Sequence, residues 1–356
     1  MSEKTGSGRT RFPFISADAF VSPRDRAALN ALQKTPLLPL LVRKYNEYAV
    51  DRIFYVQNSA ESVRCGPRQF PTLFAMMQEA ASILDVPEPE LYVKYDVRYN
   101  AYTAGVNRTF ITLHSALLDG FSNDELMYII GHEMGHIKCG HVLYQMLGRM
   151  LIPLLDMLGD VTLGVGRLAG VGLVIAFYEW LRQAEFTCDR AGLLVSQDSR
   201  AAFSATMKLG CGSTRFDAEM DVEAFLEQAR AHSEQVGLEG IAKALVFLLY
   251  TWNLDHPQVV FRAKGLDEWI KSGAYDIILG GKYSQDMTGG NQLGSQRRCA
   301  GCDTMVSSTV RFCPNCGNDL NSSGPAAPAP SASCAKCGSA LARGAKFCAD
   351  CGAPVP

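Results

Sequence analysis

The chain contains 356 residues, of which 47% are hydrophobic and 20% are charged, and its formal net charge is −2. This composition is that of a globular protein, and a chain of this length accommodates one large core with small additional modules. The balanced charge excludes a protein whose overall electrostatic field draws it to nucleic acid or to anionic lipid.

The N-terminal residues give no sign of a secretory signal. Residues 1–22 are rich in Ser, Gly, Lys and Arg, and we expect them to be disordered. The first apolar run, at 36–42, is too short and too far from the N-terminus for a signal peptide, which predicts a cytoplasmic location. Residues 35–85 are expected to be helical and to belong to a principal domain that spans 23–281.

A strongly marked helix is predicted over residues 123–142. Ser122 and Glu125 match a capping box, and an apolar run follows them directly. Glycines interrupt this helix, each at a cost of about 1 kcal/mol relative to alanine. A close packing partner would explain them, so we expect another element to lie against the helix at Gly131, Gly135 and Gly140.

The same helix carries the sequence His-Glu-Met-Gly-His at residues 132–136. His132 and His136 are one helical turn apart on one face, where two neutral imidazoles can bind Zn²⁺. Glu133 lies about 100° around the helix from His132 and can accept a proton from a zinc-bound water. The motif therefore predicts the site of a zinc-dependent peptidase. The alternative is an ordinary helix with two surface histidines.

The spacing leaves the third zinc ligand to another part of the chain. His141 follows His132 by nine residues, so it points away from the metal while the helix stays regular. The extended pattern HExxHxxGxxH would place its third histidine at residue 142, which is Val142 here. This excludes the class of zinc peptidases that takes all three ligands from one motif.

Residues 147–181 are apolar apart from a narrow stripe of charged side chains. After this stripe, the apolar run Leu168–Tyr178 is 11 residues long, whereas a membrane span needs about 20. We therefore expect a buried helical hairpin, or an apolar arm that lies against a membrane or a partner, in preference to a transmembrane hairpin. The stripe consists of Arg149, Asp156, Asp160 and Arg167.

An acidic pair further along the chain is the best candidate for the missing ligand. Glu185 and Asp189 are four residues apart and share a helix face. Glu185 can bind zinc, and Asp189 can hydrogen-bond the second ring nitrogen of a ligand histidine and fix its tautomer. The alternative is an exposed acidic pair bridged to Arg182 and Arg190.

Eight of the 12 cysteines lie after residue 298 and form two repeats of paired CxxC motifs. This spacing is typical of structural zinc sites with four cysteine ligands, and a disulfide framework is the alternative. We expect zinc ribbons at 298–318 and 333–353, with flexible linkers at 282–297 and 319–332. The expected ligands are Cys299, Cys302, Cys313 and Cys316 in the first ribbon and Cys334, Cys337, Cys348 and Cys351 in the second.

The ribbons carry no basic stripe and no aromatic stacking platform. Their aromatic residues, Phe312 and Phe347, each lie beside a ligand cysteine, as core residues do. A protein partner or a polypeptide substrate is therefore favoured over nucleic acid as the target of the tail.

Several segments, taken in order, resemble the zinc metallopeptidase family that includes HtpX and the CAAX prenyl proteases. The resemblance implies one catalytic zinc held by His132, His136 and Glu185, with Glu133 as the catalytic residue. The family's Glu-x-x-Ala-Asp pattern has Cys188 in place of alanine here. The matching segments are Asn100–Gly105 with Phe110–Leu113, Gly131–His136, Glu185–Arg190, and His256-Pro257 with Arg262.

The expected fold is α+β and mainly helical, a gluzincin-type metallopeptidase domain with a small sheet before the catalytic helix, followed by the two ribbons. His256 is the candidate donor to the developing oxyanion, with Arg262 as its support. Phe110–His114 is predicted to be an edge strand to which an extended, unfolded polypeptide could add. The candidate substrate contacts are Asn100, Ala101, Tyr102, Phe110 and Thr112.

The leading interpretation is a zinc metalloendopeptidase of protein quality control, with one catalytic and two structural zinc ions and with access to a membrane surface. Two alternatives stay open: a non-catalytic zinc-binding interaction protein, and a protease kept latent by its own linker or tail. The presence of Glu133 favours the enzyme, because a structural zinc site has no need of a general base.

Overall fold

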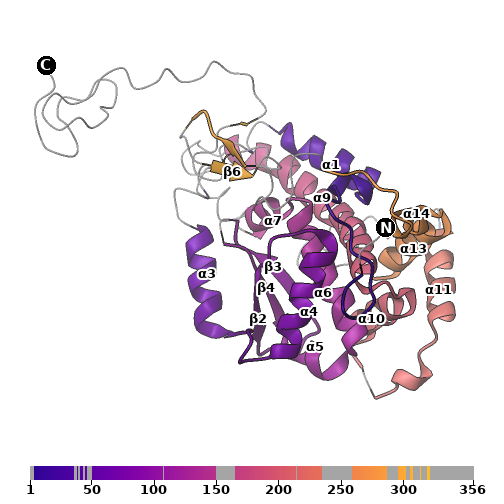
Figure 1. Ribbon diagram of the computed structural model, residues 1–356. Coiled ribbons are helices and arrows are strands. Elements are labelled where there is room, and N and C mark those ends of the chain that lie inside the picture. The colour runs from indigo at the N-terminus through magenta and orange to yellow at the C-terminus, as the bar shows by residue number, and fades with distance from the viewer. Residues whose placement is uncertain are drawn as a thin grey trace, which may run out of the picture.

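A small mixed sheet and a pair of helices packed against each other form the framework of the protein, seen in the computed structural model in Figure 1. The α+β, mainly helical class expected from the sequence is confirmed. The structure describes residues 4–35, 38, 41–42, 45, 50–106, 108–149, 165–213, 215–234, 259–286, 296–301, 305–307, 313 and 319–320.

The N-terminal segment is packed against the domain, so the prediction that residues 1–22 are disordered is wrong for the described residues 4–22. Phe12, Ile15 and Phe20 are buried in the core, and the Phe12 N–H donates to the Ile83 carbonyl at 3.0 Å. Burial of these three apolar side chains holds the segment against the domain, although its overall composition is polar. A short 3₁₀ helix follows at Ala17–Ala19.

The sheet has the strand order β1-β2-β4-β3, and its second and third strands are parallel while the other pairs are antiparallel. Phe110–His114 forms β4 and is an interior strand, which corrects the prediction that it lies at an edge. Its five residues are all buried, as expected of a strand covered on both faces. The edge beside it is β3. The strands are Val63–Arg64 (β1), Glu90–Lys94 (β2), Ala101–Ala104 (β3) and Phe110–His114 (β4).

Helices surround this sheet, with α4 and α6 lying over one of its faces in Figure 1 and α3 beside it. In the described part of the chain before the long α9, the helices are Pro23–Gln33 (α1), Val50–Glu61 (α3), Pro71–Leu84 (α4), Ser115–Gly120 (α5), Asn123–Lys138 (α6) and Val142–Arg149 (α7). Those from α9 onward are Val165–Ser196 (α9), Ser199–Cys211 (α10), Val222–Glu234 (α11), Val259–Lys271 (α13) and Ala274–Leu279 (α14), with a 3₁₀ helix at Asp217–Glu219.

The helix pair α6 and α9 is packed closely at the glycines of α6. A β-carbon on Gly131 would lie 2.5 Å from the Val195 β-carbon, and one on Gly135 would lie 2.7 Å from that of Ala191. The close neighbour expected from these glycines is therefore confirmed. Gly140 has a different role: with a φ of +69° it lies just beyond the end of α6, which stops at Lys138 and not at residue 142.

The start of α6 has the capping box that the sequence predicts. The Ser122 hydroxyl accepts the Glu125 N–H at 3.3 Å, and the Glu125 carboxylate accepts the Ser122 N–H at 2.7 Å. These two bonds satisfy backbone groups that a helix start leaves without partners. They fix where the helix begins and therefore which face carries its histidines.

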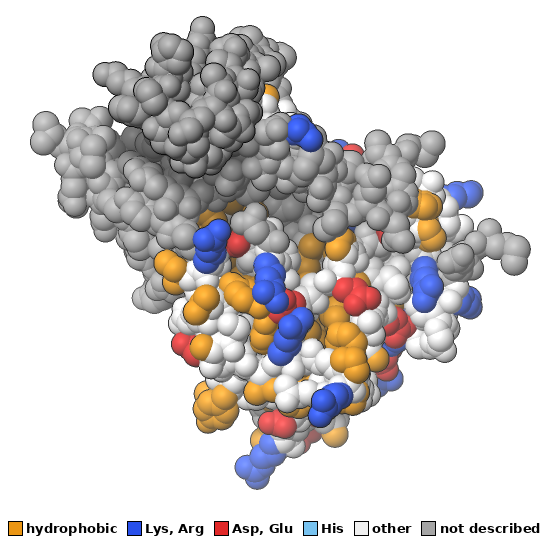
Figure 2. All heavy atoms as spheres, turned by 60° about the vertical axis from the view of Figure 1, so that its left-hand side comes forward, with side chains coloured by type: hydrophobic (Ala, Val, Ile, Leu, Met, Phe, Trp, Pro, Cys, Tyr) orange, Lys and Arg blue, Asp and Glu red, His pale blue; other side chains and the backbone are white. Residues whose placement is uncertain are grey.

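The stretch 147–181 is described only in part, because residues 150–164 lie outside the described residues. From residue 165 onward it belongs to α9, a single helix of 32 residues. Across the described part of the chain, no helix combines the length and the apolarity needed to cross a membrane. Figure 2 shows the face that carries α3 and the sheet, where apolar side chains are interspersed with acidic and basic ones.

The C-terminal region is described at a few points. Gln296–Arg298 (β5) and Met305–Ser307 (β6) pair as antiparallel strands, and Cys299 and Cys313 are buried. Residues 282–286, which begin the predicted flexible linker, pair with the N-terminal segment: the Ser16 N–H donates to the Ser284 carbonyl at 2.9 Å, and the Asp286 N–H donates to the Phe14 carbonyl at 2.8 Å. Most of the remaining linker and ribbon residues lie outside the described residues, as do the predicted site residues His256, Cys302, Cys316, Cys334, Cys337, Cys348 and Cys351.

Candidate metal centre

Three side chains from the helix pair converge on one point in the interior. His132 and His136 extend from α6, and Glu185 extends from α9; their exposed fractions are 3%, 0% and 3%. One Glu185 oxygen lies 3.3 Å from His132 Nε2, and the other lies 3.5 Å from His136 Nε2. Ligands about 2.0–2.1 Å from a tetrahedral Zn²⁺ are separated by about 3.4 Å. The donor set therefore fits Zn²⁺ in chemistry, and each histidine Nε2 lies about one ligand-to-ligand separation from an oxygen of Glu185.

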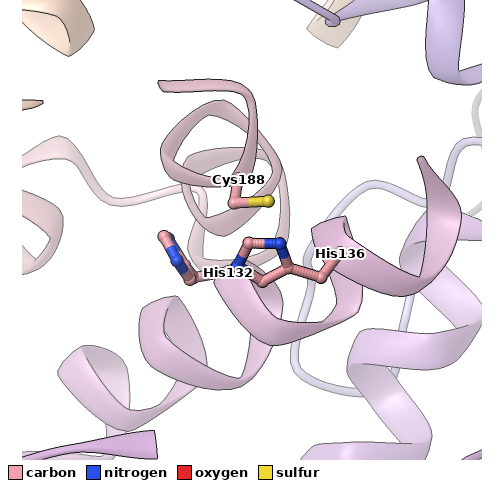
Figure 3. Close-up of side chains that lie close together, drawn as sticks. All are labelled: His132, His136 and Cys188. Carbon is pink, nitrogen blue, oxygen red and sulfur yellow. The ribbon is translucent and has the colours of Figure 1, made fainter. Parts of the chain in front are cut away.

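Cys188, one turn along α9 from Glu185, also approaches the two histidines. Ligand atoms of His132, His136 and Cys188 all lie within 4.8 Å of one another. Figure 3 shows these three side chains close together. Burial raises the pKa of the Cys188 thiol well above its usual value, so zinc would have to displace the thiol proton in order to bind this sulfur. Glu185 is the stronger candidate for the third ligand, because its carboxylate reaches the Nε2 atom of both histidines.

The second ring nitrogen of His132 faces Asp189, where the sequence predicts this contact. His132 Nδ1 lies 3.0 Å from Asp189 Oδ1. Arg262 donates to both oxygens of Asp189, at 2.6 and 2.9 Å, and Tyr128 donates to Oδ1 at 2.8 Å. Arg262 also lies 3.4 Å from Glu185 Oε2. The alternative of an exposed acidic pair is wrong, since Asp189 is 1% and Glu185 is 3% exposed.

The electrostatics follow from burial and from these ion pairs. Burial opposes ionisation of Asp189, but Arg262 and then His132 outweigh it, so the pKa of Asp189 is lowered. Burial alone would lower the pKa of His132, yet the Glu185 and Asp189 carboxylates leave it raised. For His136 burial dominates and lowers the pKa to about 4, so this ring is neutral and able to bind a metal.

His141 lies beside His136, on the Nδ1 side of that ring and away from its Nε2 atom. The expectation for His141 assumed a regular helix, whereas α6 ends at Lys138 and the chain turns at Gly140. The turn brings His141 Nδ1 to 3.3 Å from His136 Nδ1. On its other side, His141 Nε2 lies 3.2 Å from an Asp25 carboxylate oxygen. Nothing in the sequence around Asp25 distinguishes it from a common acidic residue in the first turn of a helix.

Glu133 is 1% exposed and is held by an edge strand. The Thr103 hydroxyl, on β3, donates to Glu133 Oε2 at 2.6 Å. Sequence analysis did not single out Thr103, although it lies in the same segment as the predicted substrate contacts. The contact places the Glu133 carboxylate between the helix that bears the histidines and the edge of the sheet.

The predicted substrate contacts divide into two groups. Ala101 and Tyr102 lie on the edge strand β3, and Asn100 directly precedes it. Phe110 and Thr112 are 1% and 0% exposed on the interior strand, where Phe110 packs against Tyr92 and Thr112 donates to Asn58. These two residues belong to the core, so their prediction as substrate contacts is wrong.

Known proteins resemble this chain over most of its described core. A family model described as peptidase family M48 matches residues 67–270. The plastoglobule-localized metallopeptidase 48, chloroplastic, of Arabidopsis thaliana is 32% identical over 299 residues, which cover 78% of this chain and 83% of that protein. A protease HtpX homolog of Caldanaerobacter subterraneus subsp. tengcongensis is 25% identical over 204 residues, covering 49% of this chain and 68% of the relative. Another, from Thermoanaerobacter pseudethanolicus, is 23% identical over 221 residues, covering 53% and 74%.

Proposed function

Since this chain belongs to peptidase family M48 and is a zinc metalloprotease, we propose that His132, His136 and Glu185 hold its zinc and that Glu133 is the general base. The observation that carries the ligand assignment is the position of the Glu185 carboxylate. Its two oxygens lie 3.3 and 3.5 Å from the Nε2 atoms of the two histidines, which is the spacing of ligands around one tetrahedral ion.

Bound zinc would lower the pKa of a water molecule and polarise the peptide carbonyl. Glu133 accepts the proton that this water loses as its oxygen bonds to the carbonyl carbon. Glu133 then gives that proton to the amide nitrogen as the C–N bond breaks, so the carboxylate is regenerated. Thr103 holds Oε2 of Glu133 and keeps the carboxylate aimed during both transfers.

The edge strand β3 suggests how a polypeptide is bound. β3 ends the sheet and also contacts Glu133 through Thr103, so a chain paired with β3 would pass beside the base. Pairing through backbone groups gives affinity without strong sequence selection. This supports unfolded or damaged polypeptides as substrates and a role in protein quality control. Ala101 and Tyr102 remain the candidate contacts, with Asn100 before them.

His256 stays a prediction as oxyanion donor. Arg262 takes a different role in this proposal from the support of His256: it holds Asp189 and approaches Glu185, and so it orients the zinc ligands. The eight tail cysteines are proposed to bind two structural zinc ions and to recruit a protein partner or substrate. We keep a cytoplasmic location with access to a membrane surface as a prediction.

Cleavage of casein by the zinc-loaded full chain, beside Glu133→Gln, tests the proposal. The variant keeps the shape of the side chain but cannot accept the proton, so we expect a loss of about 10²–10⁴-fold in kcat at unchanged zinc content. Glu185→Gln is the matched second variant, and it should lose zinc as well as activity. Full activity in Glu133→Gln would exclude Glu133 as the base.

Two further outcomes separate the alternatives. If the wild-type chain is inactive, a chain shortened after Asp286 should be assayed, because Ser284 and Asp286 hydrogen-bond the N-terminal segment and belong to the domain. Activity that appears only on shortening would establish a latent protease. Continued inactivity with zinc bound would establish a non-catalytic zinc protein.

A further inference from the structure

The groups behind His136 form a connected chain that reaches the N-terminal helix. We propose that His141 and Asp25 are positioning residues that fix the tautomer and aim of His136, so that α1 forms part of the metal centre. This inference rests on the proposed function in one respect, namely that His136 binds zinc through Nε2. It assigns a role to residues outside the His-Glu-x-x-His motif and, for Asp25, outside the span 67–270 that matches the family.

The distances allow one consistent arrangement of protons. A metal on His136 Nε2 leaves the ring proton on Nδ1, and the atom facing it is His141 Nδ1 at 3.3 Å. If His141 accepts there, its own proton lies on Nε2, which faces Asp25 Oδ2 at 3.2 Å. Each link in the chain therefore has one donor and one acceptor. A carboxylate acting through a ring nitrogen is the usual way in which a ligand histidine is oriented.

Asp25 is held firmly enough to serve as the end of this chain. It is 1% exposed, near the N-terminus of α1. Thr187 donates to Oδ2 at 2.6 Å, and Trp180 donates to Oδ1 at 3.1 Å, both from α9. With His141, three donors converge on one buried carboxylate. Because α9 also carries Glu185, the same helix supports a ligand directly and His136 indirectly.

Gln145 is the competing partner of His136. Its Nε2 lies 3.1 Å from His136 Nδ1 but also 3.3 Å from His136 Nε2, so it sits beside the ring and does not single out Nδ1. In the orientation shown, the amide nitrogen is a donor and cannot accept the Nδ1 proton, whereas a turned amide would present Oε1, which can. His141 Nδ1 can accept it. Gln145→Met is therefore the variant that separates the two partners.

The experiment measures zinc affinity in the full chain by competition with a chelator, with zinc counted per chain. His136→Ala supplies the background from all other zinc sites. We expect His141→Phe to weaken zinc binding about 10–100-fold, the usual cost of losing such a supporting partner. Asp25→Asn should also weaken zinc binding, since one amide oxygen cannot accept from three donors. The effect should be smaller than in His141→Phe, because His141 remains beside His136. Gln145→Met should have a smaller effect than His141→Phe.

Tyr144→Phe is the matched control. It removes the hydroxyl that accepts from Gln33, a hydrogen bond between α1 and α7 that is not one of the links from Asp25 to His136, and it keeps the ring that packs against Trp180. Zinc affinity should stay at the wild-type value in this variant. A merely structural role for Asp25 would lower the thermal midpoint in Asp25→Asn and in Tyr144→Phe, and would leave the zinc affinity alike in both.

A spectroscopic signature provides the second readout. With Co²⁺ in place of zinc, the visible absorption bands that are lost in His136→Ala should shift in His141→Phe and in Asp25→Asn, and stay unchanged in Tyr144→Phe. Wild-type zinc affinity and wild-type bands in a folded His141→Phe would overturn the proposal. If that variant does not fold, the volume-conserving Asp25→Asn decides by the same two measures. If His136→Ala retains as much zinc as the wild-type chain, the ligand assignment itself is wrong.

Discussion

The two histidines proposed to bind zinc are supported in different ways: one by a carboxylate paired with a buried cation, the other through a carboxylate that accepts from a hydroxyl and an indole. Behind His132 stands an ion pair, Asp189 with Arg262, in which both partners are buried. Behind His136 stands a second imidazole, and its carboxylate partner Asp25 is bonded to a hydroxyl and an indole. Asp189 and Arg262 both lie within residues 67–270, which match the family, whereas Asp25 lies outside that span. A buried charge that loses its partner is costly, while a lost neutral partner costs less.

The largest effect should come from breaking the charged support with Arg262→Met. Removal of the guanidinium leaves the Asp189 and Glu185 carboxylates without their shared cation in the interior. We expect the free energy of unfolding to fall by about 3–5 kcal/mol. Denaturant unfolding with zinc removed from all proteins alike measures this without a contribution from the metal.

Asp25→Asn is the matched variant for the other support. It leaves no unpaired charge, so about 1–3 kcal/mol is expected, the usual cost of an incompletely satisfied buried polar group. Equal losses in Arg262→Met and Asp25→Asn would contradict the contrast between charged and neutral support.

The second-largest effect should come from a substitution that pushes α6 and α9 apart, because both supports depend on the contact between these two helices. Gly135→Ala places a methyl group 2.7 Å from the Ala191 β-carbon and 3.1 Å from the Cys188 α-carbon, which is backbone and cannot turn aside. We expect a loss of about 1–3 kcal/mol from overpacking. Zinc affinity should fall too, because α6 moves away from Glu185. Chelator competition and denaturant unfolding of the same preparation measure both.

Gly148→Ala is the control for this substitution. Among the described residues, the nearest atoms to its new methyl would be side-chain carbons at 3.7 Å, an ordinary contact. The higher helix propensity of alanine should stabilise α7 by up to about 1 kcal/mol. A destabilised Gly148→Ala would mean that helical glycines here are needed for reasons other than the approach of α9.

Several residues of the candidate site could be predicted from the sequence alone. His132, Glu133 and His136 follow from helical spacing, and Asp189 follows from the same spacing applied to Glu185, since one period places each pair on a face. The position of His141 beside His136 depends on the end of α6 at Lys138, and the glycines in the sequence do not fix that boundary. Such a boundary depends on tertiary packing and on one residue with a positive φ.

The remaining misses have similar causes. Asp25 becomes part of the site only because α1 packs on α9, a contact across more than 150 residues that no local pattern encodes. The interior position of β4 was missed because a short apolar run does not distinguish an edge strand from a central one. Thr103 depended on that sheet order, since it acts from the strand that is the true edge.

A second buried carboxylate on α6, that of Glu125, shows whether every buried charge on this helix contributes to stability as the charged support of His132 does. Glu125 lies at the start of α6, away from the histidines, and accepts from Lys208 at 3.0 Å and from Ser204 at 2.6 Å. Burial acts to raise the pKa of Glu125, but Ser204, Ser122 and Lys208 outweigh it and leave it lowered. Its contribution to stability is therefore present above the unfolded pKa of about 4.3 and is lost as the pH falls through the lowered value.

Glu125→Gln should remove that acid-side loss at a cost of about 1 kcal/mol near neutral pH. The free energy of unfolding, measured against pH for both proteins, shows it as a flatter curve below about pH 4.3 in the variant. The pKa of Lys208 is raised, so its own contribution persists to alkaline pH and should not distort this window. An unchanged acid limb would mean that Glu125 is not ionised in the folded protein.

The smallest effect is expected from Cys188→Ala, and it bears on the region between the two supports. Cys188 Sγ lies 3.7 Å from His141 Nδ1, and its approach to both histidines makes it a competitor of Glu185. If Glu185 is the ligand, removing the thiol should change zinc affinity by less than about threefold, well below the cost of a lost supporting partner. Cys139→Ala, which removes a half-buried thiol that is not part of the group formed by His132, His136 and Cys188, is the control. A loss greater than about tenfold in Cys188→Ala alone, together with loss of a thiolate-to-cobalt absorption band, would instead make Cys188 the third ligand. Arg262 would then lie against a Glu185 carboxylate that binds no metal. The difference between the supports of His132 and His136 would need an explanation that does not involve Glu185 as a ligand.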